Sequence, residues 1–107
     1  PANMAHACRL GAEYGVDFIK TAYTGSVESF RQVIEQVYVP VVVLGGGKSD
    51  DPRELLQGIH DAMQAGASGV AVGRNIYQHA APDRMTAAIA AIVHGGATVD
   101  AALQHIK

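Results

Sequence analysis

The chain has 107 residues, of which 49% are hydrophobic and 17% charged, and its formal net charge is −2. This length and composition are typical of one globular domain, here 1–107, and the scattered lysines and arginines argue against nucleic-acid or membrane-surface partners, which leaves small anionic metabolites as the expected ligands. No apolar run approaches the roughly 20 residues that cross a bilayer, no signal peptide is recognisable, and the single cysteine, Cys8, favours a reducing cytoplasm.

The first predicted element is a helix over 3–14, which Gly15 ends in a left-handed conformation. This helix is already under way at the start of the chain, and the first residue is Pro1 rather than methionine. We therefore expect a fragment of a longer protein or a processed product. A short apolar strand over 15–21 follows the helix and carries Lys20 near its end.

Lys20 lies where this strand opens into the polar loop 22–25. A lysine amine, with an ordinary pKa of roughly 10.4, is a weak nucleophile at neutral pH, but desolvation in a pocket favours its neutral form. Lysines in such pockets form Schiff bases with carbonyl substrates. The alternative is that Lys20 extends from the strand end into solvent, and its position alone leaves both interpretations open.

The second helix is predicted to begin at its N-cap, Ser26. Its apolar residues recur at intervals of three and four, which indicates one buried face. These residues are Phe30, Val33, Ile34 and Val37. The β-branched run 39–44 follows and predicts a second buried strand that ends at Gly45.

A glycine-rich loop, 45–49, leaves the second strand and ends in Gly-Lys-Ser, as a nucleotide-binding Walker A loop does. Val42, however, occupies the position of the first glycine of that motif, and a β-branched residue is badly suited to the turn there. We therefore favour another interpretation, in which the glycines let backbone N–H groups approach an anion. A tight turn without a ligand is the remaining alternative.

Residues 51–54, Asp-Pro-Arg-Glu, predict the start of the third helix, with Asp51 as N-cap, a proline at the first helical position and Glu54 as the capping glutamate. This helix runs to Gly66. The third strand, 67–72, ends at a second glycine, in the sequence Gly73-Arg74-Asn75. A short helix at Arg74 or Asn75, a helix from Pro82 to Gly95-Gly96, and a tail helix over 98–106 complete the chain.

Strands and helices alternate, which implies a parallel sheet covered by helices. The strand ends Lys20, Leu44 and Val72 are 24 and 28 residues apart, close to the repeat of a barrel with eight units in about 250 residues. Three strands cannot close a barrel, and alone they leave two edges and an apolar face open. We expect the C-terminal portion, about strands six to eight, of a (β/α)8 TIM barrel. A flavodoxin-like sheet, the alternative, would need more strands.

Five segments together resemble the C-terminal part of class I, Schiff-base aldolases, and this resemblance covers nearly the whole chain. Archaeal-type fructose-bisphosphate aldolases match best, together with their relatives, an aminodideoxyheptulosonate synthase and a phosphosugar thiolase. The segment around Lys20 is also similar to that of deoxyribose-phosphate aldolases. The segments are Asp17-Phe18-Ile19-Lys20-Thr21, Tyr23-Thr24-Gly25, Gly45-Gly46 with Lys48, Asp61-Ala62-Met63, and Gly69-Val70-Ala71-Val72-Gly73-Arg74-Asn75-Ile76.

The resemblance implies that Lys20 is the Schiff-base lysine at the end of strand six. It also implies that substrate phosphate binds to the loops after strands seven and eight, largely through backbone N–H groups. The implied phosphate-binding residues are Gly45, Gly46, Gly73 and Arg74. Tyr23 and Lys48 are further candidates for lining the site, with a surface position as the alternative for Lys48. Leu44 departs from the pattern, because relatives carry a small residue there; it would either narrow the phosphate pocket or point into the barrel core.

The implied function is that of a class I aldolase, which cleaves or forms a phosphorylated sugar through a lysine Schiff base and is most similar to fructose-bisphosphate aldolase. The thiolase, the synthase and a non-catalytic phosphate-binding module are alternatives. The expected partners are a phosphorylated sugar or ketone and further copies of the same chain, as a homo-oligomer. We expect no cofactor: the lysine route needs no metal, and no histidine pair has the spacing of a helical zinc site. General acid and base groups are missing, so the chain alone is expected to be inactive.

Overall fold

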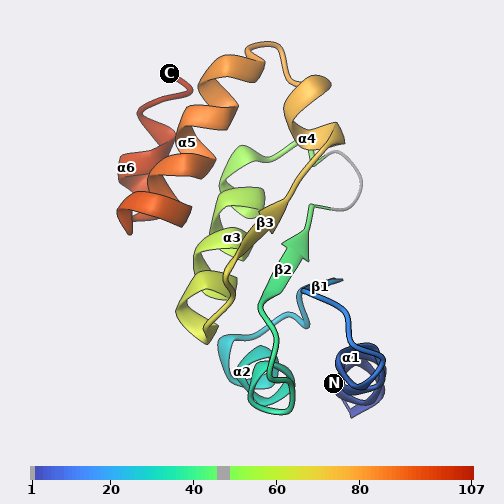
Figure 1. Ribbon diagram of the computed structural model, residues 1–107. Coiled ribbons are helices and arrows are strands. Elements are labelled where there is room, and N and C mark those ends of the chain that lie inside the picture. Colours follow the sequence, from blue (N-terminus) through green and yellow to red (C-terminus); the bar gives the residue numbers. More distant parts are fainter. Residues whose placement is uncertain (1, 46–48) are drawn as a thin grey trace.

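The computed structural model describes residues 2–45 and 49–107 and shows one three-stranded parallel sheet in the order β1-β2-β3 (Figure 1). Helices alternate with the strands, as predicted. The elements are α1 (Ala2–Glu13), β1 (Ile19–Thr21), α2 (Val27–Glu35), β2 (Val41–Leu44), α3 (Pro52–Ala65), β3 (Gly69–Ala71), α4 (Arg74–Tyr77), α5 (Pro82–Gly95) and α6 (Val99–Leu103).

Side-chain caps fix where α2 and α3 begin. Ser26 is the N-cap of α2, and its hydroxyl accepts a hydrogen bond from the backbone N–H of Ser29 at 3.1 Å. Asp51 caps α3 in the same way, by accepting from the N–H of Arg53 at 3.0 Å. One detail of the prediction was wrong: the N–H of Asp51, which a capping box assigns to Glu54, donates instead to the hydroxyl of Ser49 at 3.2 Å.

Hydrogen-bonded pairing limits the strands to fewer residues than the apolar runs predict. β1 begins at Ile19 because its first partner in β2 is Val41. β2 in turn begins directly after Pro40, which has no N–H to donate to a neighbouring strand. The tail helix is also shorter than predicted, since it ends at Leu103 rather than Ile106.

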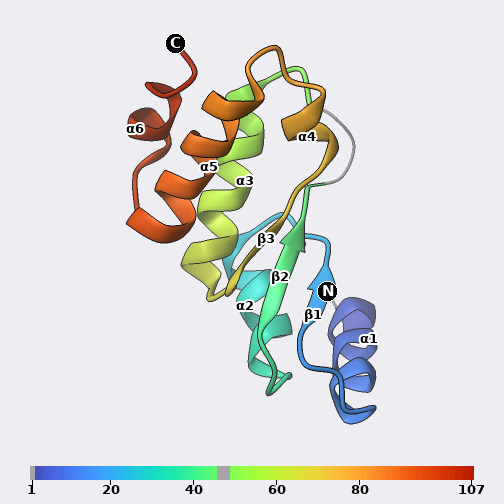
Figure 2. The ribbon, with the colours of Figure 1, turned by 45° about the horizontal axis from the view of Figure 1, so that its top comes forward.

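Side chains alternate between the two faces of the sheet, and the helices cover one face. Val41 and Val43 of β2 are 2% and 4% exposed and pack in a core with Phe30 and Val33 of α2. A second core joins α3, α5 and α6 to Val70 of β3. In both ribbon views α3 and α5 lie on the same side of the strands, with α6 outside α5 (Figures 1 and 2).

The opposite face of the sheet is open within the part of the chain that the structure describes. The strand register places Lys20 beside Val42, and Leu44 beside Ala71. Lys20 and Leu44 are both exposed, Leu44 by 38% of its surface, and Val42 and Ala71 are half-buried. Among the described residues, no apolar layer covers Leu44, as expected for three strands of a larger sheet.

No helix among residues 2–45 and 49–107 combines the length and apolar character that spanning a bilayer requires. Cys8 is free and buried in the core between α1 and β2, where it packs as a small apolar side chain.

Tyr23 follows β1 and packs on the helix side of the sheet. Its ring meets that of Phe30 edge to face, with centroids 5.4 Å apart. Its hydroxyl is buried and has no hydrogen-bond partner among the described residues. Burial raises the pKa of the Tyr23 phenol, and the negative charge of Asp61 raises this pKa further.

The Tyr23 hydroxyl predicts a pH-dependent stability. Above about pH 10 the unfolded phenol ionises first, because burial holds the folded pKa higher, so stability falls as pH rises through the unfolded value. We expect Tyr23→Phe to reduce this alkaline loss and to change the free energy of unfolding by less than about 1 kcal/mol at pH 7. Urea unfolding of the full-length protein at pH 7 and pH 10.5 measures both effects.

Tyr38→Phe is the matched control, because the Tyr38 hydroxyl donates to the carbonyl of Ala12 at 2.6 Å. This variant should lose about 0.5–1 kcal/mol at pH 7. A Tyr23→Phe variant that loses more stability than Tyr38→Phe at neutral pH would contradict the assignment of an unpartnered hydroxyl.

The open face predicts that the 107 residues on their own associate or stay partly molten. Burial of apolar surface contributes about 25 cal/mol per Å², and unpaired strand edges also favour association. Sedimentation of a dilute sample, with near-UV dichroism, tests this, and Leu44→Ser should shift the population toward monomer. A rigid wild-type monomer with a cooperative melt would show that the sheet needs no further strands.

Candidate active site

A pocket of about 290 Å³ lies at the carboxyl ends of the three strands. Its lining includes four of the site residues that the sequence predicts, one from β1 and three from the exits of β2 and β3. These are Lys20, Gly45, Gly73 and Arg74, and Leu44, Ala71 and Tyr77 complete the lining. The structure thus brings Lys20 and Arg74, which are far apart in the sequence, to one pocket.

Lys20 faces this pocket because its neighbours in β1 face the helices. Thr21 is 6% exposed, and Ile19 packs against the core that contains Val41. Strand alternation then turns Lys20 to the open face. The Lys20 side chain is exposed, so the described strands position the amine without removing it from water.

The two described glycines of the pocket differ in how closely they are packed. A Cβ atom on Gly45 would lie 2.9 Å from Cγ1 of Val72, whereas one on Gly73 would lie 3.4 Å from the ring of Tyr77, which is ordinary van der Waals contact. Close packing therefore explains the glycine at position 45 but not the one at position 73.

Tyr77 is a pocket residue that the sequence analysis missed. It lies one helical turn after Gly73, and its backbone N–H donates to the carbonyl of Gly73 at 3.0 Å. The i, i+4 spacing on a predicted helix was the available signal, because it places Tyr77 over Gly73.

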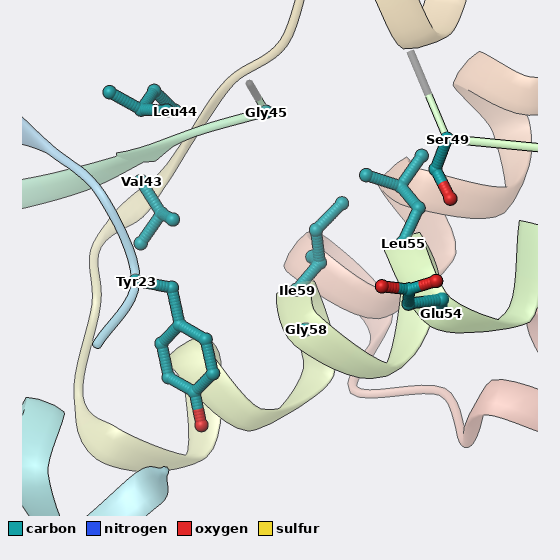
Figure 3. Close-up of a pocket in the computed structure, with 9 residues that line it drawn as sticks. All are labelled: Tyr23, Val43, Leu44, Gly45, Ser49, Glu54, Leu55, Gly58 and Ile59. Carbon is teal, nitrogen blue, oxygen red and sulfur yellow. The ribbon is translucent and has the colours of Figure 1, made fainter. Parts of the chain in front are cut away.

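Leu44 lines the pocket and lies on the open face of the sheet, which would face the interior of a closed barrel, so its two expected positions coincide. Figure 3 shows the side chains of Val43 and Leu44 on opposite sides of β2, with Val43 toward Tyr23 and α3. Leu44 therefore reduces the space between Lys20 and the loops that leave β2 and β3.

Tyr23 and Lys20 line different pockets, which share Leu44 and Gly45. Tyr23 lines a pocket of about 250 Å³ between β2 and α3, together with Val43, Glu54 and Ile59 (Figure 3). The described lining of the Lys20 pocket does not include Tyr23. The other predicted site residues, Gly46 and Lys48, lie outside the described residues.

Asn75 connects the exits of β2 and β3. Its side-chain oxygen accepts a hydrogen bond from the N–H of Ser49 at 2.7 Å. Its side-chain nitrogen donates to the carbonyl of Gly45 at 3.1 Å. One buried amide in α4 therefore contacts both residues that flank 46–48.

The charges of the pocket favour an anionic ligand. Lys20 and Arg74 contribute two cations, and no carboxylate is among its described lining residues. Elsewhere in 2–45 and 49–107, no three side chains of histidine, cysteine, aspartate or glutamate come together as a metal site would require. The arrangement can hold a phosphate beside a primary amine, which is the combination that Schiff-base chemistry on a phosphorylated ketone requires.

Curated proteins with sequence similarity to this chain include two synthases, each matched over 102 residues, which are 95% of the chain. A 2-amino-3,7-dideoxy-D-threo-hept-6-ulosonate synthase of Halobacterium salinarum is 56% identical, and the match covers 38% of that synthase. A 2-amino-4,5-dihydroxy-6-oxo-7-(phosphonooxy)heptanoate synthase of Streptomyces griseus is 38% identical, with 37% of its length covered. The chain thus spans less than two fifths of these relatives.

Solved structures agree with the predicted fold. An archaeal fructose 1,6-bisphosphate aldolase matches with a TM-score of 0.87 and 35% identity, over 90% of this chain and 38% of that one. A Schiff-base-forming fructose-1,6-bisphosphate aldolase, studied through its reaction intermediates, matches with a TM-score of 0.85 and 34% identity, over 88% of this chain and 38% of that one. The chain therefore has the α/β fold of the C-terminal part of a TIM-barrel aldolase, which confirms the prediction.

The model of the DeoC/LacD family aldolases matches residues 1–79, which include β1, β2, β3 and the pocket between them. This match confirms the resemblance to Schiff-base aldolases inferred from the sequence. The chain belongs to the DeoC/LacD family of aldolases.

Proposed function

We propose that the whole protein containing this chain is a class I aldolase that acts on a phosphorylated sugar through a Schiff base on Lys20. The observation that carries this proposal is that Lys20 and Arg74 line one pocket, so that an amine and a guanidinium lie at the strand ends. Active sites of TIM barrels lie at this end of the strands. The similarity to a Schiff-base-forming aldolase supports the same chemistry.

In the proposed reaction, the neutral amine of Lys20 attacks the substrate ketone, and loss of water gives an iminium. As a general base takes the proton of the hydroxyl on the β carbon, the bond between the α and β carbons breaks and its electron pair passes to the iminium, which leaves an enamine and releases an aldehyde. Protonation of the enamine and hydrolysis of the resulting iminium return the free lysine. Arg74 and the backbone at Gly45 and Gly73 hold the phosphate, so that the ketone meets the amine in a fixed geometry.

In the whole protein, the barrel strands other than β1, β2 and β3 have two proposed roles. They remove Lys20 from water, since it is exposed on the open face, and desolvation favours the neutral amine that the attack requires. They also supply the general acid and base, for which the described pocket lining offers no carboxylate. We therefore propose that the 107 residues alone are inactive.

Two substrates fit this proposal. The Streptomyces griseus synthase makes a 6-oxo-7-phosphonooxy acid, and fructose 1,6-bisphosphate likewise carries a ketone beside a phosphorylated carbon. We propose a fructose-bisphosphate-type substrate first. The 56% identity to the Halobacterium salinarum synthase favours aminodideoxyheptulosonate synthesis as the second candidate. Release of triose phosphates from fructose 1,6-bisphosphate would favour the first candidate substrate over the second.

We also propose that the whole protein is a homo-oligomer in the cytoplasm. The buried free thiol of Cys8 fits a reducing compartment.

Lys20→Met is expected to abolish turnover and borohydride trapping in the full-length protein, because methionine has a similar length but no amine. Incubation of the wild type with dihydroxyacetone phosphate and borohydride should add the reduced triose phosphate to Lys20, as peptide mass mapping would show. Lys107→Met is the matched control, since Lys107 is exposed at the end of the chain, and it should be trapped as the wild type is. An adduct on any other lysine, or carbon–carbon cleavage by Lys20→Met, would disprove the mechanism.

Arg74→Ala is expected to raise the concentration of dihydroxyacetone phosphate that half-saturates trapping by about tenfold, because a charged hydrogen bond contributes about 1.5–3 kcal/mol. Trapping of unphosphorylated dihydroxyacetone should change little. Arg84→Ala, which removes an exposed arginine of α5, is the control. Equal half-saturation in Arg74→Ala and the wild type would show that the Arg74 guanidinium does not hold the phosphate.

A further inference from the structure

Asn75 is the residue of α4 that neither the pocket lining nor the proposed chemistry accounts for. It is 3% exposed, and with Thr21 it makes up the buried polar side chains found in 2–45 and 49–107. A buried amide is costly unless its polar atoms find partners, so a buried asparagine needs a physical reason.

The contacts of Asn75 determine the orientation of its amide. The N–H of Ser49 can only donate and the carbonyl of Gly45 can only accept, so the side-chain oxygen must face Ser49 and the nitrogen must face Gly45. Asparagine offers a donor and an acceptor side by side at this length, whereas an aspartate or an apolar residue of similar size would lose at least one of the two bonds.

These two bonds fix the β2 exit to the β3 exit. Gly45 directly follows β2, and Asn75 follows Gly73 and Arg74 after β3. The N–H of Ile76 donates to the carbonyl of Gly73 at 2.8 Å, so the backbone that holds Asn75 also holds Gly73 in place. Lys20, by contrast, is positioned by the pairing of β1 with β2.

We propose that Asn75 is a positioning residue, which fixes Gly45 relative to Arg74 so that both meet the phosphate of one phosphorylated ketone; this inference rests on the proposed function. Asn75 acts through the backbone of Gly45 and Ser49 and does not touch the substrate. Its loss lets the two strand exits move independently, which weakens phosphate binding and leaves the reach of the Lys20 amine unchanged.

Borohydride trapping at Lys20 in the full-length protein tests this, with dihydroxyacetone phosphate and unphosphorylated dihydroxyacetone as the two probes. In Asn75→Ala the half-saturating concentration of the phosphorylated probe should rise about tenfold or more, since two buried hydrogen bonds are lost, while that of the unphosphorylated probe changes less than about twofold. Asn75→Leu, which fills the same space without hydrogen bonds, should behave alike. Gln78→Ala, at the exposed end of the same short helix, should match the wild type for both probes.

A merely structural role would weaken trapping of both probes equally, and that result would overturn the proposal, as would unchanged half-saturation in both Asn75 variants. If neither variant folds, hydrogen exchange of the Ser49 N–H in the wild type decides: protection supports the bond to Asn75, and exchange at the rate of a free peptide overturns it. Failure of the wild type to form any adduct at Lys20 would instead refute the proposed function, and with it the positioning role.

Discussion

The alternation of side chains along β2 is the constraint on which the site depends. Val41 and Val43 are held in the core under α2 and α3, so Val42 and Leu44 must face the other way. Parallel pairing carries this choice to the neighbouring strands, where it turns Lys20 and Ala71 to the same open face. A slip of one residue would put Lys20 into the apolar core, where an unpaired ammonium is strongly unfavourable. Burial of two valines thus decides where the amine points.

The loops that leave β2 and β3 are coupled by packing as well as by hydrogen bonds. Gly45 lies against Val72, with no room for a side chain. The amide of Asn75 then joins the two exits. Because Gly45 serves the protein's own packing, Arg74 is a cleaner probe of phosphate binding than Gly45.

Much of this arrangement could be predicted from residue patterns, because local rules govern it. The caps Ser26 and Asp51, the end of α3 at Gly66 and the alternation of strands and helices depend on neighbours within a few residues. The position of Tyr23 could not be predicted, since a loop residue can turn to either side of a sheet, and only the contact with Phe30 determines which. The bonds of Asn75 to Gly45 and Ser49 were equally out of reach, because they join segments that meet only once the strands pair. The exposure of Lys20 to water in the whole protein could not be predicted either, because it depends on barrel strands other than β1, β2 and β3.

We expect strand register to bring Lys20 and a bound phosphate, held at the exits of β2 and β3, into one pocket. A crystal structure of the full-length protein, reduced with borohydride in the presence of dihydroxyacetone phosphate, tests this. We expect continuous density from Nζ of Lys20 to the former carbonyl carbon, with the phosphate beside Arg74 and within hydrogen-bond distance of the backbone at Gly45 or Gly73. Density on another lysine, or a phosphate bound away from the exits of β2 and β3, would contradict it.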